Sequence, residues 1–496
     1  MRKISTALIS VFNKDGIEEI ATKLHNQNIK IISTGGTKSF IENLGIPVTS
    51  VESITDYPPI LGGRVKTLHP KIFGGILYRD EKQVDLDEIR KFSIPKIDLV
   101  IVDLYPFEDT VKSTDDKSEI IEKIDIGGVS LIRAAAKNYN KTLVVSSKKN
   151  YKEFITYLEK NKYSTDITFR KKFALKAFNV TSEYDSQIDE YLGLESGHYP
   201  ILRYGENPHQ KAFFKGDLDN VFQKLNGKDL SYNNLLDIDS AIKLISEFTS
   251  VTFAIIKHNN ACGIASCSSV VTSYKKALQS DPLSAFGGVL ITNHKVDISS
   301  ASEIDNLFFE ILIAPNYDDE SLNILKSKKN RILLKLKETN FEPKSSKKIL
   351  GGYLNQDPDV AENKIENWKV VTKKIPSVEI YEDLEFANKI VKHSKSNAIV
   401  LVKNSQMISS GVGQTSRVDA LKHAIEKAKT FGFDIKGSVM ASDAFFPFPD
   451  CVEIAAGSGI CSIVQPGGSI KDDLSIDVCN NTNISMVLTG MRHFYH

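Results

Sequence analysis

The chain has 496 residues, of which 41% are hydrophobic and 25% are charged, and its formal net charge is +1. This length is too great for one hydrophobic core, so we expect two to four domains. The near-neutral charge excludes a general affinity for nucleic acid or a membrane surface, and the apolar runs are too short to span a bilayer. Five cysteines in so long a chain predict free thiols in a reducing compartment, which makes the cytoplasm the expected location.

Short apolar runs alternate with segments of helical period from residue 5 to about residue 160. The expected strands are TALISVF (6–12), KIIST (30–34), DLVIVDLYPF (98–107) and KTLVVSS (141–147). The N-terminus lacks a cleavage-like small-residue site, so its apolar run predicts a buried strand and not a signal peptide. This alternation predicts a doubly wound, parallel α/β sheet that binds ligands at the carboxyl ends of its strands.

Two turns near the start of the chain carry residues suited to phosphate. In SVFNKDG, Lys14 precedes the first expected helix, and in STGGTKS the residues Gly35, Gly36 and Thr37 lie at the N-terminus of the next one. Backbone N–H groups and the helix dipole attract anions at such a position. One glycine pair is commonly just a tight turn, but two such turns in adjacent strand–helix units indicate an anion site.

The segment ILGGRVKTLHPKIFGGIL (60–77) follows no clean helical or strand period. It carries Arg64, Lys66, Thr67 and His69 among glycines, so we expect an ordered loop rich in hydrogen-bond donors. A surface loop whose charges are merely solvated accounts for the same residues. The spacing alone leaves both interpretations open.

Periodicity is lost over residues 185–202, which predicts a connection between two domains, 1–195 and 196–496. The second region has its own expected strands, VTFAIIKH, GGVLITN, FFEILIAP, AIVLVKN, ICSIVQP and ISMVLTG, and we expect two similar strand–helix halves. The lysine-rich segment 322–348 invites a nucleic-acid interpretation. It lacks interleaved aromatic residues, so a solvated surface is the expectation.

The stretch KHNNACGIASC (257–267) holds a lysine, a histidine and two cysteines. Its C-x4-C spacing matches neither a zinc site nor a redox motif, so we expect no metal there. Within a regular strand Lys257 and His258 would point to opposite faces, so they can share a site only where the strand ends. A lone histidine after a strand is more often structural than catalytic.

Several motifs resemble the N-terminal half of a bifunctional purine-biosynthesis family that joins AICAR transformylase to IMP cyclohydrolase. The motifs are SVFNKDG, STGGT, GGRVKTLHP, DLVIVDLYPF, IDIGG and IRAAAKN. The resemblance implies a methylglyoxal-synthase-like fold. The residues that it implies are Lys14, Thr34, Gly35, Gly36 and Thr37 for a ribotide 5′-phosphate, Arg64, Lys66 and Thr67 for the base, and Tyr105, Asp125 and Lys137 around the closing ring. Lys66, Tyr105, Asp125 and Lys137 would be catalytic.

The remaining motifs are similar to the transformylase half of the same family and occur in the family's order. They are LRYGENPHQKAFF, KHNNACGIA, SDPLSAFGGVL, FFEILIAP, KSNAIVL, GVGQTSRVDA, SDAFFPFPD, IVQPGGSIKDD and VLTGMRHFYH. The resemblance implies a duplicated, cytidine-deaminase-like α/β fold without zinc. The implied catalytic residues are Lys257, His258 and Asn397. The implied binding residues are Arg203, Tyr204, Phe286, Gly287, Arg417, Phe445, Phe448, Asp450 and Arg492.

The resemblance implies two successive reactions. A formyl group passes from 10-formyltetrahydrofolate to the amine of AICAR, and the product FAICAR closes to IMP with loss of water. It also implies a homodimer without a catalytic metal, bound to neither nucleic acid nor membrane. The chain departs from the family pattern at Phe12-Asn13, where only backbone contacts to phosphate are then expected, and at Ala261 and Pro449.

Two other classes of protein fit parts of the sequence. A metal-dependent hydrolase or deaminase would need ligands such as H-x-E and P-C-x-x-C, and both motifs are missing. A non-catalytic, nucleotide-binding regulatory module fits the N-terminal half. It does not explain a second half that is rich in matched site residues.

Overall fold

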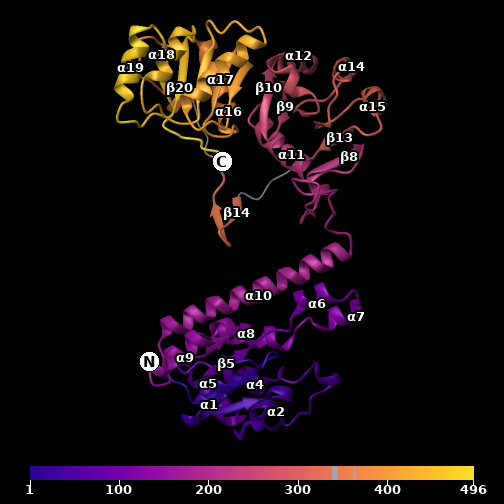
Figure 1. Ribbon diagram of the computed structural model, residues 1–496, viewed down its shortest axis with the longest axis vertical. Helices are drawn as coiled ribbons and strands as arrows, with labels where there is room; N and C mark the ends of the chain where they lie inside the picture. The colour runs from indigo at the N-terminus through magenta and orange to yellow at the C-terminus, as the bar shows by residue number, and fades with distance from the viewer. Residues whose placement is uncertain (338–344, 361–364) are drawn as a thin grey trace. The chain divides into compact units, whose positions relative to one another are not determined.

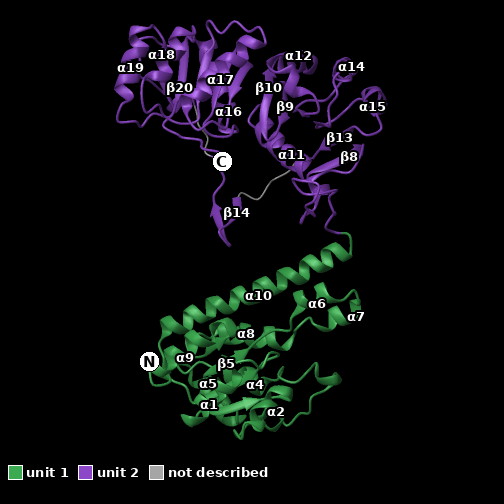
Figure 2. Cartoon of the chain, viewed as in Figure 1, with its two compact units in different colours: residues 1–197 green, residues 198–496 purple. Residues whose placement is uncertain are grey.

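The computed structural model of the chain describes residues 1–337, 345–360 and 365–496 (Figure 1). These residues form two compact units, Met1–Gly197 (unit 1) and His198–His496 (unit 2), which Figure 2 distinguishes by colour. Each unit has sheets and hydrophobic cores of its own.

Unit 1 is built on a parallel sheet whose five strands lie in the order β4-β3-β2-β5-β6. Its strands are β2 (Thr6–Ser10), β3 (Lys30–Ser33), β4 (Thr49–Ser50), β5 (Leu99–Val102) and β6 (Leu143–Val145), and a separate antiparallel pair consists of β1 (Arg2–Lys3) and β7 (Ser164–Thr165). Alternate residues serve opposite cores, Ile9 on one face and Leu8 on the other. Both faces are covered, as in the doubly wound sheet predicted from the sequence.

Helices flank this sheet on both sides. α1 (Ile17–Asn26) and α9 (Tyr151–Lys160) pack on the face that contains Ile9, and α4 (Pro70–Leu77) and α8 (Gly127–Lys137) pack on the opposite face. Further helices of unit 1 are α2 (Gly35–Asn43), α3 (Val51–Thr55), α5 (Gln83–Lys91), α6 (Phe107–Ser113), α7 (Lys117–Glu122) and α10 (Ile167–Glu195), with 3-10 turns at Leu61–Gly63 and Lys148–Asn150. The strands therefore lead into turns and helices at one edge of the sheet, where ligands bind in such folds.

The connection predicted over 185–202 is wrong in its first part, because α10 continues to Glu195. Three residues keep a helical period through this charged stretch, since Tyr184, Ile188 and Tyr191 pack together in the cluster around α6. The polar residues between them hide the period in the sequence. Packing against α6 extends the helix beyond the point at which its pattern fades.

The loop predicted over 60–77 is wrong in its second half, where α4 begins at Pro70. His69 caps this helix, because its Nδ1 accepts a hydrogen bond from the amide two residues later at 3.1 Å. A proline at the first helical position leaves no N–H unpaired. Ile72 and Ile76, one turn apart, are buried against the sheet. The half that carries the predicted site residues stays irregular apart from one 3-10 turn.

Unit 2 contains, within its described residues, a sheet of 12 strands shared by two halves. The first half contributes β8 (Phe222–Asn226), β9 (Thr252–Lys257), β10 (Asn260–Ser266), β11 (Val289–Thr292), β12 (Ile311–Ala314) and β13 (Ile332–Leu336). The second half contributes β16 (Lys369–Val370), β17 (Ile399–Lys403), β18 (Gln406–Gly411), β19 (Val439–Ser442), β20 (Ser462–Gln465) and β21 (Ser485–Leu488). Antiparallel pairing of β10 with β18 joins the halves, and a separate hairpin consists of β14 (Ser345–Ile349) and β15 (Gly352–Gln356).

The two halves repeat one topology. From the junction outward, the strand order is β10-β9-β11-β12-β13-β8 in the first half and β18-β17-β19-β20-β21-β16 in the second. Each half has an antiparallel hairpin, a third strand antiparallel to it and then parallel neighbours. Each ends in an antiparallel edge strand. Every strand of the first half therefore has a counterpart in the second.

The helices of unit 2 repeat in the same way. α11 (Tyr232–Ile245) and α16 (Val378–Lys392) pack on the sheet face that both halves share. The opposite face is covered by α12 (Val270–Ser280), α14 (Ile298–Ile304) and α15 (Asp319–Lys326) in the first half, and by α17 (Arg417–Thr430), α18 (Asp450–Gly457) and α19 (Asp472–Asn481) in the second. Shorter pieces are α13 (Pro282–Ala285), Leu218–Asn220 and Ile365–Asn367.

A glycine lets one helix of each half approach its hairpin. A Cβ atom on Gly263 of β10 would lie 1.9 Å from the carbonyl oxygen of Ala277 in α12. A Cβ atom on Gly411 of β18 would lie 1.9 Å from the carbonyl oxygen of Ala420 in α17. No side chain fits at this distance, so close backbone packing requires glycine at each of these two positions.

The lysine-rich segment 322–348 lies partly outside the described residues, at 338–344. Its described part contains the end of α15 and strand β13, and Lys326, Lys328 and Lys329 between them are exposed. Across the described ranges, the chain has no helix that combines the length and the apolar character needed to cross a membrane.

Candidate functional site

A hollow of about 540 Å³ lies in unit 1 at the carboxyl ends of β2, β3 and β5. The sequence-predicted residues that line it are Lys14, Thr34, Gly35, Gly36, Thr37, Arg64, Lys66, Thr67, Tyr105 and Asp125. These residues come from several separate turns of the chain, and the sheet brings their turns to one edge. The hollow is therefore where a doubly wound sheet would hold a ligand.

One end of the hollow is arranged for an anion. α2 begins at Gly35 with Thr34 as its N-cap, so backbone amides of its first turn have no partner within the helix. A Cβ atom added to Gly35 would lie 3.4 Å from Lys66 Nζ, which places this ammonium beside the helix N-terminus. Within the described chain, Lys66 forms no hydrogen bond or ion pair. Burial is the main cause that lowers the pKa of Lys14, Asp103 opposes it, and the charge of Lys66 adds to it.

Asp103 binds the first strand-to-helix turn and is not among the residues predicted from the sequence. Its carboxylate accepts hydrogen bonds from the backbone amides of Phe12 and of Asn13, the latter at 2.9 Å. Burial raises the pKa of Asp103 more than these bonds lower it. Both amides already donate to Asp103, and the backbone contact to phosphate expected from this turn stays a prediction. The available signal was an acidic residue directly after the buried strand LVIV.

Arg64 is held by a carboxylate at the rim of the same hollow. Its Nε atom lies 3.1 Å from both carboxylate oxygens of Glu122, and a second guanidinium nitrogen also donates to Glu122. Glu122 itself lines the hollow. Thr67, three residues further along, is buried beside Gly127. The planar guanidinium is therefore fixed in direction before any ligand arrives.

Asp125 and Tyr105 form a polar pair in the wall of the hollow. The Asp125 carboxylate accepts a hydrogen bond from the Gly128 amide at 2.6 Å and another from the Tyr105 amide. Burial raises the pKa of Asp125 more than these two bonds lower it. Burial, followed by the charge of Asp125, also raises the pKa of Tyr105. The pair combines a carboxyl and a phenol that hold their protons to higher pH than usual, which suits proton transfer.

Tyr184 of α10 supports this pair from behind. Its hydroxyl accepts a hydrogen bond from the Asp125 amide at 2.9 Å and donates one to the Lys123 carbonyl at 2.5 Å. The last turns of α10, which the sequence did not predict as helix, therefore fix the backbone of a predicted site residue.

Phe12 stands at the mouth of the hollow, at a position where the chain departs from its family pattern. Its ring meets Tyr105 edge to face, with 5.5 Å between the centroids. The ammonium of Lys123 lies 5.9 Å from the Phe12 ring and 6.0 Å from the Tyr105 ring. The aromatic side chain therefore packs against Tyr105 instead of contributing a polar group.

Lys137 is the predicted unit 1 residue that the hollow does not include. It is the last residue of α8, whereas Gly127 and Gly128 at the other end of that helix line the hollow. A helix of 11 residues is ~16 Å long. The length of α8 therefore separates Lys137 from the other residues of its group within one chain, and its catalytic role stays a prediction.

Lys257 and His258 lie where a strand ends. Lys257 is the last residue of β9, and His258 and Asn259 form a two-residue turn into β10. Both turn residues have a left-handed backbone, with φ of 51° and 63°, as a tight hairpin requires. Lys257 Nζ donates to the carbonyls of Phe286 at 2.9 Å and Gly287 at 3.1 Å. The residues that follow the turn, NACGIAS, form the returning strand β10.

Hydrogen bonds connect this turn to Asn397. Asn260, the first residue of β10, accepts a hydrogen bond from the Lys395 amide at 3.0 Å through its side-chain oxygen. Asn397 donates from Nδ2 to the carbonyls of Gln414 at 3.0 Å and Thr415 at 3.2 Å. The structure therefore brings the three predicted catalytic residues of unit 2 to one junction between its halves.

The same path continues to two predicted arginines. Arg417 begins α17, and its guanidinium donates to Asp443 Oδ1 at 2.9 Å. The backbone carbonyl of Asp443 accepts from the His493 amide at 3.1 Å, which brings the C-terminal segment alongside. Arg492 lies in that segment, 4.3 Å from the centre of the Phe494 ring. Arg417 is mostly buried, whereas Arg492 is exposed and free to meet a ligand.

Arg203 and Phe286 are exposed, whereas their predicted neighbours Tyr204 and Gly287 are half-buried. Arg203 stacks over the Tyr204 ring at 5.3 Å, close to the start of α11, where the Asn233 side chain binds the nearby Glu206 carbonyl. Phe286 is 62% exposed despite the apolar character of its motif.

The SDAFFPFPD motif divides its aromatic residues between core and surface. Phe446 is fully buried, Phe445 is half-buried and Phe448 is 51% exposed. The ammonium of Lys471 lies 4.2 Å from the Phe448 ring. Asp450 is the first residue of α18. The exposed rings of Phe286 and Phe448 are the type of surface on which a flat, aromatic ligand stacks.

The cysteines do not form a reactive or metal-binding cluster. All five are free, and burial raises the pKa of Cys262, in the KHNNACG stretch, to about 12. A thiol with so high a pKa is a packing residue and not a nucleophile. No group of three or more His, Cys, Asp or Glu residues that could hold a metal ion occurs among residues 1–337, 345–360 and 365–496.

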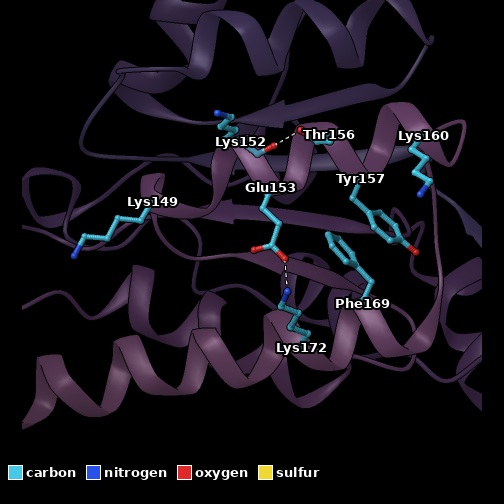
Figure 3. Close-up of a pocket in the computed structure, with 8 residues that line it drawn as sticks. All are labelled: Lys149, Lys152, Glu153, Thr156, Tyr157, Lys160, Phe169 and Lys172. Atoms are coloured by element: carbon cyan, nitrogen blue, oxygen red, sulfur yellow. Dashed lines mark hydrogen bonds and ion pairs between the residues drawn. The ribbon is translucent and has the colours of Figure 1, made fainter. Parts of the chain in front are cut away.

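A second hollow in unit 1 lies between α9 and the start of α10, away from every predicted residue (Figure 3). Its floor contains the stacked rings of Tyr157 and Phe169, whose centroids are 3.5 Å apart. The residues around these rings are Lys149, Lys152, Glu153, Thr156, Lys160 and Lys172. Lys172 pairs with Glu153 at 2.6 Å. The lining is that of an exposed basic surface.

The fold and contacts define an α/β protein of two units. Unit 1 offers an anion-binding helix N-terminus next to a protonatable carboxyl and phenol. Unit 2 offers a lysine and a histidine at a strand end, close to an asparagine and within a network that reaches two arginines.

Comparisons with known proteins agree with this class. The model of the AICARFT/IMPCHase bienzyme family matches residues 135–427, and that of the MGS-like domain matches residues 16–130. "Bifunctional purine biosynthesis protein PurH" of Bacteroides thetaiotaomicron is 56% identical, covering 100% of this chain and 99% of that protein. The protein of the same name from Aquifex aeolicus is 46% identical, covering 99% of this chain and 100% of that protein. A solved dCMP deaminase from cyanophage S-TIM5 is 18% identical with a TM-score of 0.18, covering 22% of this chain and 98% of the deaminase.

The chain belongs to the AICARFT/IMPCHase bienzyme family. It is a bifunctional enzyme of purine biosynthesis, with AICAR formyltransferase and IMP cyclohydrolase activities. The function and the methylglyoxal-synthase-like fold of the N-terminal part predicted from the sequence are thereby confirmed. The family uses a formyl-folate as its co-substrate.

Proposed function

We propose that unit 1 closes FAICAR to IMP in the 540 Å³ hollow and that unit 2 formylates AICAR at the Lys257–His258 turn. The formyl donor in this proposal is 10-formyltetrahydrofolate. The observation that carries it is the lining of the hollow, in which one helix N-terminus, two lysines and a carboxyl–phenol pair face the same space.

In the cyclisation, a carboxamide nitrogen attacks the formyl carbon of the same molecule and water leaves. The ribotide phosphate would bind at the N-terminus of α2 beside Lys14 and Lys66, which fixes the other end of the substrate. Holding two groups of one molecule together is worth up to about 7–11 kcal/mol in model reactions. Lys66 would stabilise the developing oxyanion, and Asp125 with Tyr105 would exchange the protons.

In the formyl transfer, the aromatic amine of AICAR is a weak nucleophile, because its lone pair is delocalised into the ring. His258 would contact the carboxamide of AICAR, which would relay to it the proton that the reacting amine loses. Lys257 would face the formyl oxygen and the departing folate nitrogen. Lys257 is already turned toward the carbonyls of Phe286 and Gly287, whose loop would then border the same reaction space. Asn397 would hold the reacting groups.

The binding residues of unit 2 would divide between the two substrates. Arg203, Tyr204 and Arg492 are exposed or half-buried and would bind the AICAR phosphate through charged, two-pronged contacts. The other residues proposed for the ribotide base and the folate are Phe286, Gly287, Arg417, Phe445, Phe448 and Asp450.

We further propose that the enzyme is a cytoplasmic homodimer that needs no catalytic metal. Free cysteines suit a reducing compartment. The exposed positions of Arg203, Phe286 and Arg492 leave room for a second copy to complete the transformylase site, and the position of Lys137 at the far end of α8 suits a similar role.

One assay separates the two assignments. Purified protein is given AICAR and 10-formyltetrahydrofolate, and FAICAR and IMP are quantified. Lys66→Ala should accumulate FAICAR, and His258→Ala should form neither product, whereas supplied FAICAR is still cyclised. The controls Lys149→Ala and His423→Ala remove exposed residues of the same types. Normal rates of IMP formation in both test variants would contradict the proposal.

A further inference from the structure

The duplicated hairpins of unit 2 differ at one functional position. In the first half, Lys257 precedes the turn His258-Asn259, and in the second half Lys403 precedes the turn Asn404-Ser405. All four turn residues have a left-handed backbone, with φ between 51° and 63°. The second half therefore repeats the geometry of the proposed formyl-transfer turn without its histidine.

The lysine before each turn is also held in the same way. Lys403 Nζ donates to the carbonyls of Asp434 at 3.1 Å and Lys436 at 2.6 Å, as Lys257 donates to the carbonyls of Phe286 and Gly287. What separates the two turns is therefore the residue that follows the lysine and the groups that face it.

One aspartate from the helix on the shared face supports each turn. Asp383 of α16 uses both carboxylate oxygens, which accept from the amides of Asn404 at 2.8 Å and Ser405 at 2.6 Å. Asp237 of α11 uses only Oδ1, which accepts from the Asn259 amide at 2.7 Å. Among the described residues, Oδ2 of Asp237 has no hydrogen-bond partner.

Asp237 lies within electrostatic reach of His258 and Lys257. Burial raises the pKa of this carboxyl, the Asn259 hydrogen bond opposes that effect, and the nearby charges of His258 and Lys257 oppose it further. A carboxylate that accepts a hydrogen bond from an imidazole N–H fixes the tautomer and ring direction of the histidine, and the unpaired Oδ2 is the oxygen available for such a bond. The turn that Asp383 supports contains no histidine, and Asp383 uses both of its oxygens on the backbone.

We propose that Asp237 is a positioning residue for formyl transfer. It holds the turn through Oδ1 and orients the His258 imidazole through Oδ2, so that the ring nitrogen facing the substrate is bare and can accept a proton. This inference rests on the proposed role of His258. It adds a residue outside the motif that contains the lysine and the histidine.

Two matched variants test the role of Asp237, and both formyl transfer and the melting temperature are measured for each. Asp237→Asn keeps an oxygen for the Asn259 amide but offers an NH₂ group to His258. We expect kcat for formyl transfer to fall about 10- to 100-fold, the KM for AICAR to change less than threefold, and the melting temperature to stay within about 1 °C. Asp383→Asn can accept only one of its two amide hydrogen bonds. Its melting temperature should fall by several degrees while formyl transfer stays within twofold.

Cyclisation of supplied FAICAR, catalysed by the other unit, reports whether either variant is generally damaged and should be unchanged in both. The inference is overturned if Asp237→Asn keeps the wild-type kcat, or if it loses stability and kcat together as Asp237→Ala would. His258→Ala distinguishes the two levels of the proposal. If His258→Ala retains formyl transfer, the proposed function fails. If it loses formyl transfer while Asp237→Asn does not, only the role of Asp237 fails.

Discussion

The predicted residues of the two units are arranged in different ways. In unit 1 all of them except Lys137 converge from several separate turns on one hollow of about 540 Å³. In unit 2 they follow a path of hydrogen bonds from the Lys257 turn through Asn397 to Arg417 and the C-terminal segment. A gathered site can be tested residue by residue within one chain. The unit 2 site extends along the junction of the two halves, and it is tested by asking whether a second copy of the chain supplies further residues.

The largest effect on activity is expected in the unit 1 hollow. Because burial raises the pKa of Asp125, cyclisation should fall as the pH drops through a value above that of an ordinary aspartate, where the carboxylate takes up a proton. Asp125→Asn should lower kcat for cyclisation by about 10²–10⁴-fold and abolish that acidic limb. The measurement is the pH–rate profile with supplied FAICAR. An unchanged acidic limb in the variant would exclude Asp125 as the group responsible.

Dilution should distinguish the two sites next. If a second copy completes the unit 2 site, formyl transfer per chain should fall several-fold when the protein is diluted below the dissociation constant of the dimer. Cyclisation should fall less, and only to the extent that Lys137 from a second copy contributes to the unit 1 site. Both activities are followed over a dilution series while sedimentation reports the mass. Constant formyl transfer by a species with the mass of one chain would show that unit 2 works alone.

A smaller effect is expected at the rim of the unit 1 hollow. Glu122 holds the guanidinium of Arg64, so Glu122→Gln should loosen that side chain and raise the KM for FAICAR about three- to tenfold, with little change in kcat. The control is Glu108→Gln, which removes an exposed carboxylate that pairs with Lys112 in the same unit. Equal KM values in the two variants would mean that the Arg64 contact has no role in binding.

The smallest effect concerns stability at the junction of the halves. Burial raises the pKa of the Glu247 carboxyl. Hydrogen bonds from His393 at 2.9 Å and Lys392 at 2.7 Å outweigh this effect and lower the pKa to about 2. A depressed pKa stabilises the fold above pH ~4.5, and this contribution is lost as the pH falls toward 2. Glu247→Gln should lower the free energy of unfolding of unit 2 by about 1–2 kcal/mol at pH 7.

Urea unfolding at two pH values provides the measurement. The difference between Glu247→Gln and the wild type should shrink when the pH is lowered from 7 to 3. A difference of the same size at both values would mean that the carboxylate charge does not stabilise the junction.

Regular elements could be predicted wherever hydrophobic period and burial coincide. Strands β2, β5 and β9 are continuous apolar runs, and the glycine pair after β3 does open a helix, α2. The end of α10 was missed because three packed residues carry its period among charged neighbours. β10 was missed because NACGIAS consists of small residues whose strand character depends on pairing with β9.

The site was predictable to the extent that its residues lie in recognisable motifs. Arg64 and Lys66, and likewise Lys257 and His258, are close in sequence, and the fold keeps them close. The supporting residues lacked a partner close in sequence, although Asp103 lies within the motif DLVIVDLYPF. Asp103 and Asp237 act through contacts with chain segments about 90 and 22 residues away, at Phe12 or Asn13 and at Asn259. Only the folded topology brings these partners together.

The glycine contacts of unit 2 have a mechanical consequence. Gly263 fastens β10 directly to the backbone of α12, only a few residues beyond the turn that carries His258. A side chain at residue 263 would push β10 away from α12 and so shift the turn that carries His258. Phe448, whose exposed ring is proposed to lie near the folate, is the position to vary in a test of formyl-donor choice. Gly411 allows a similar close approach of β18 to α17 in the second half, at a different point of its hairpin.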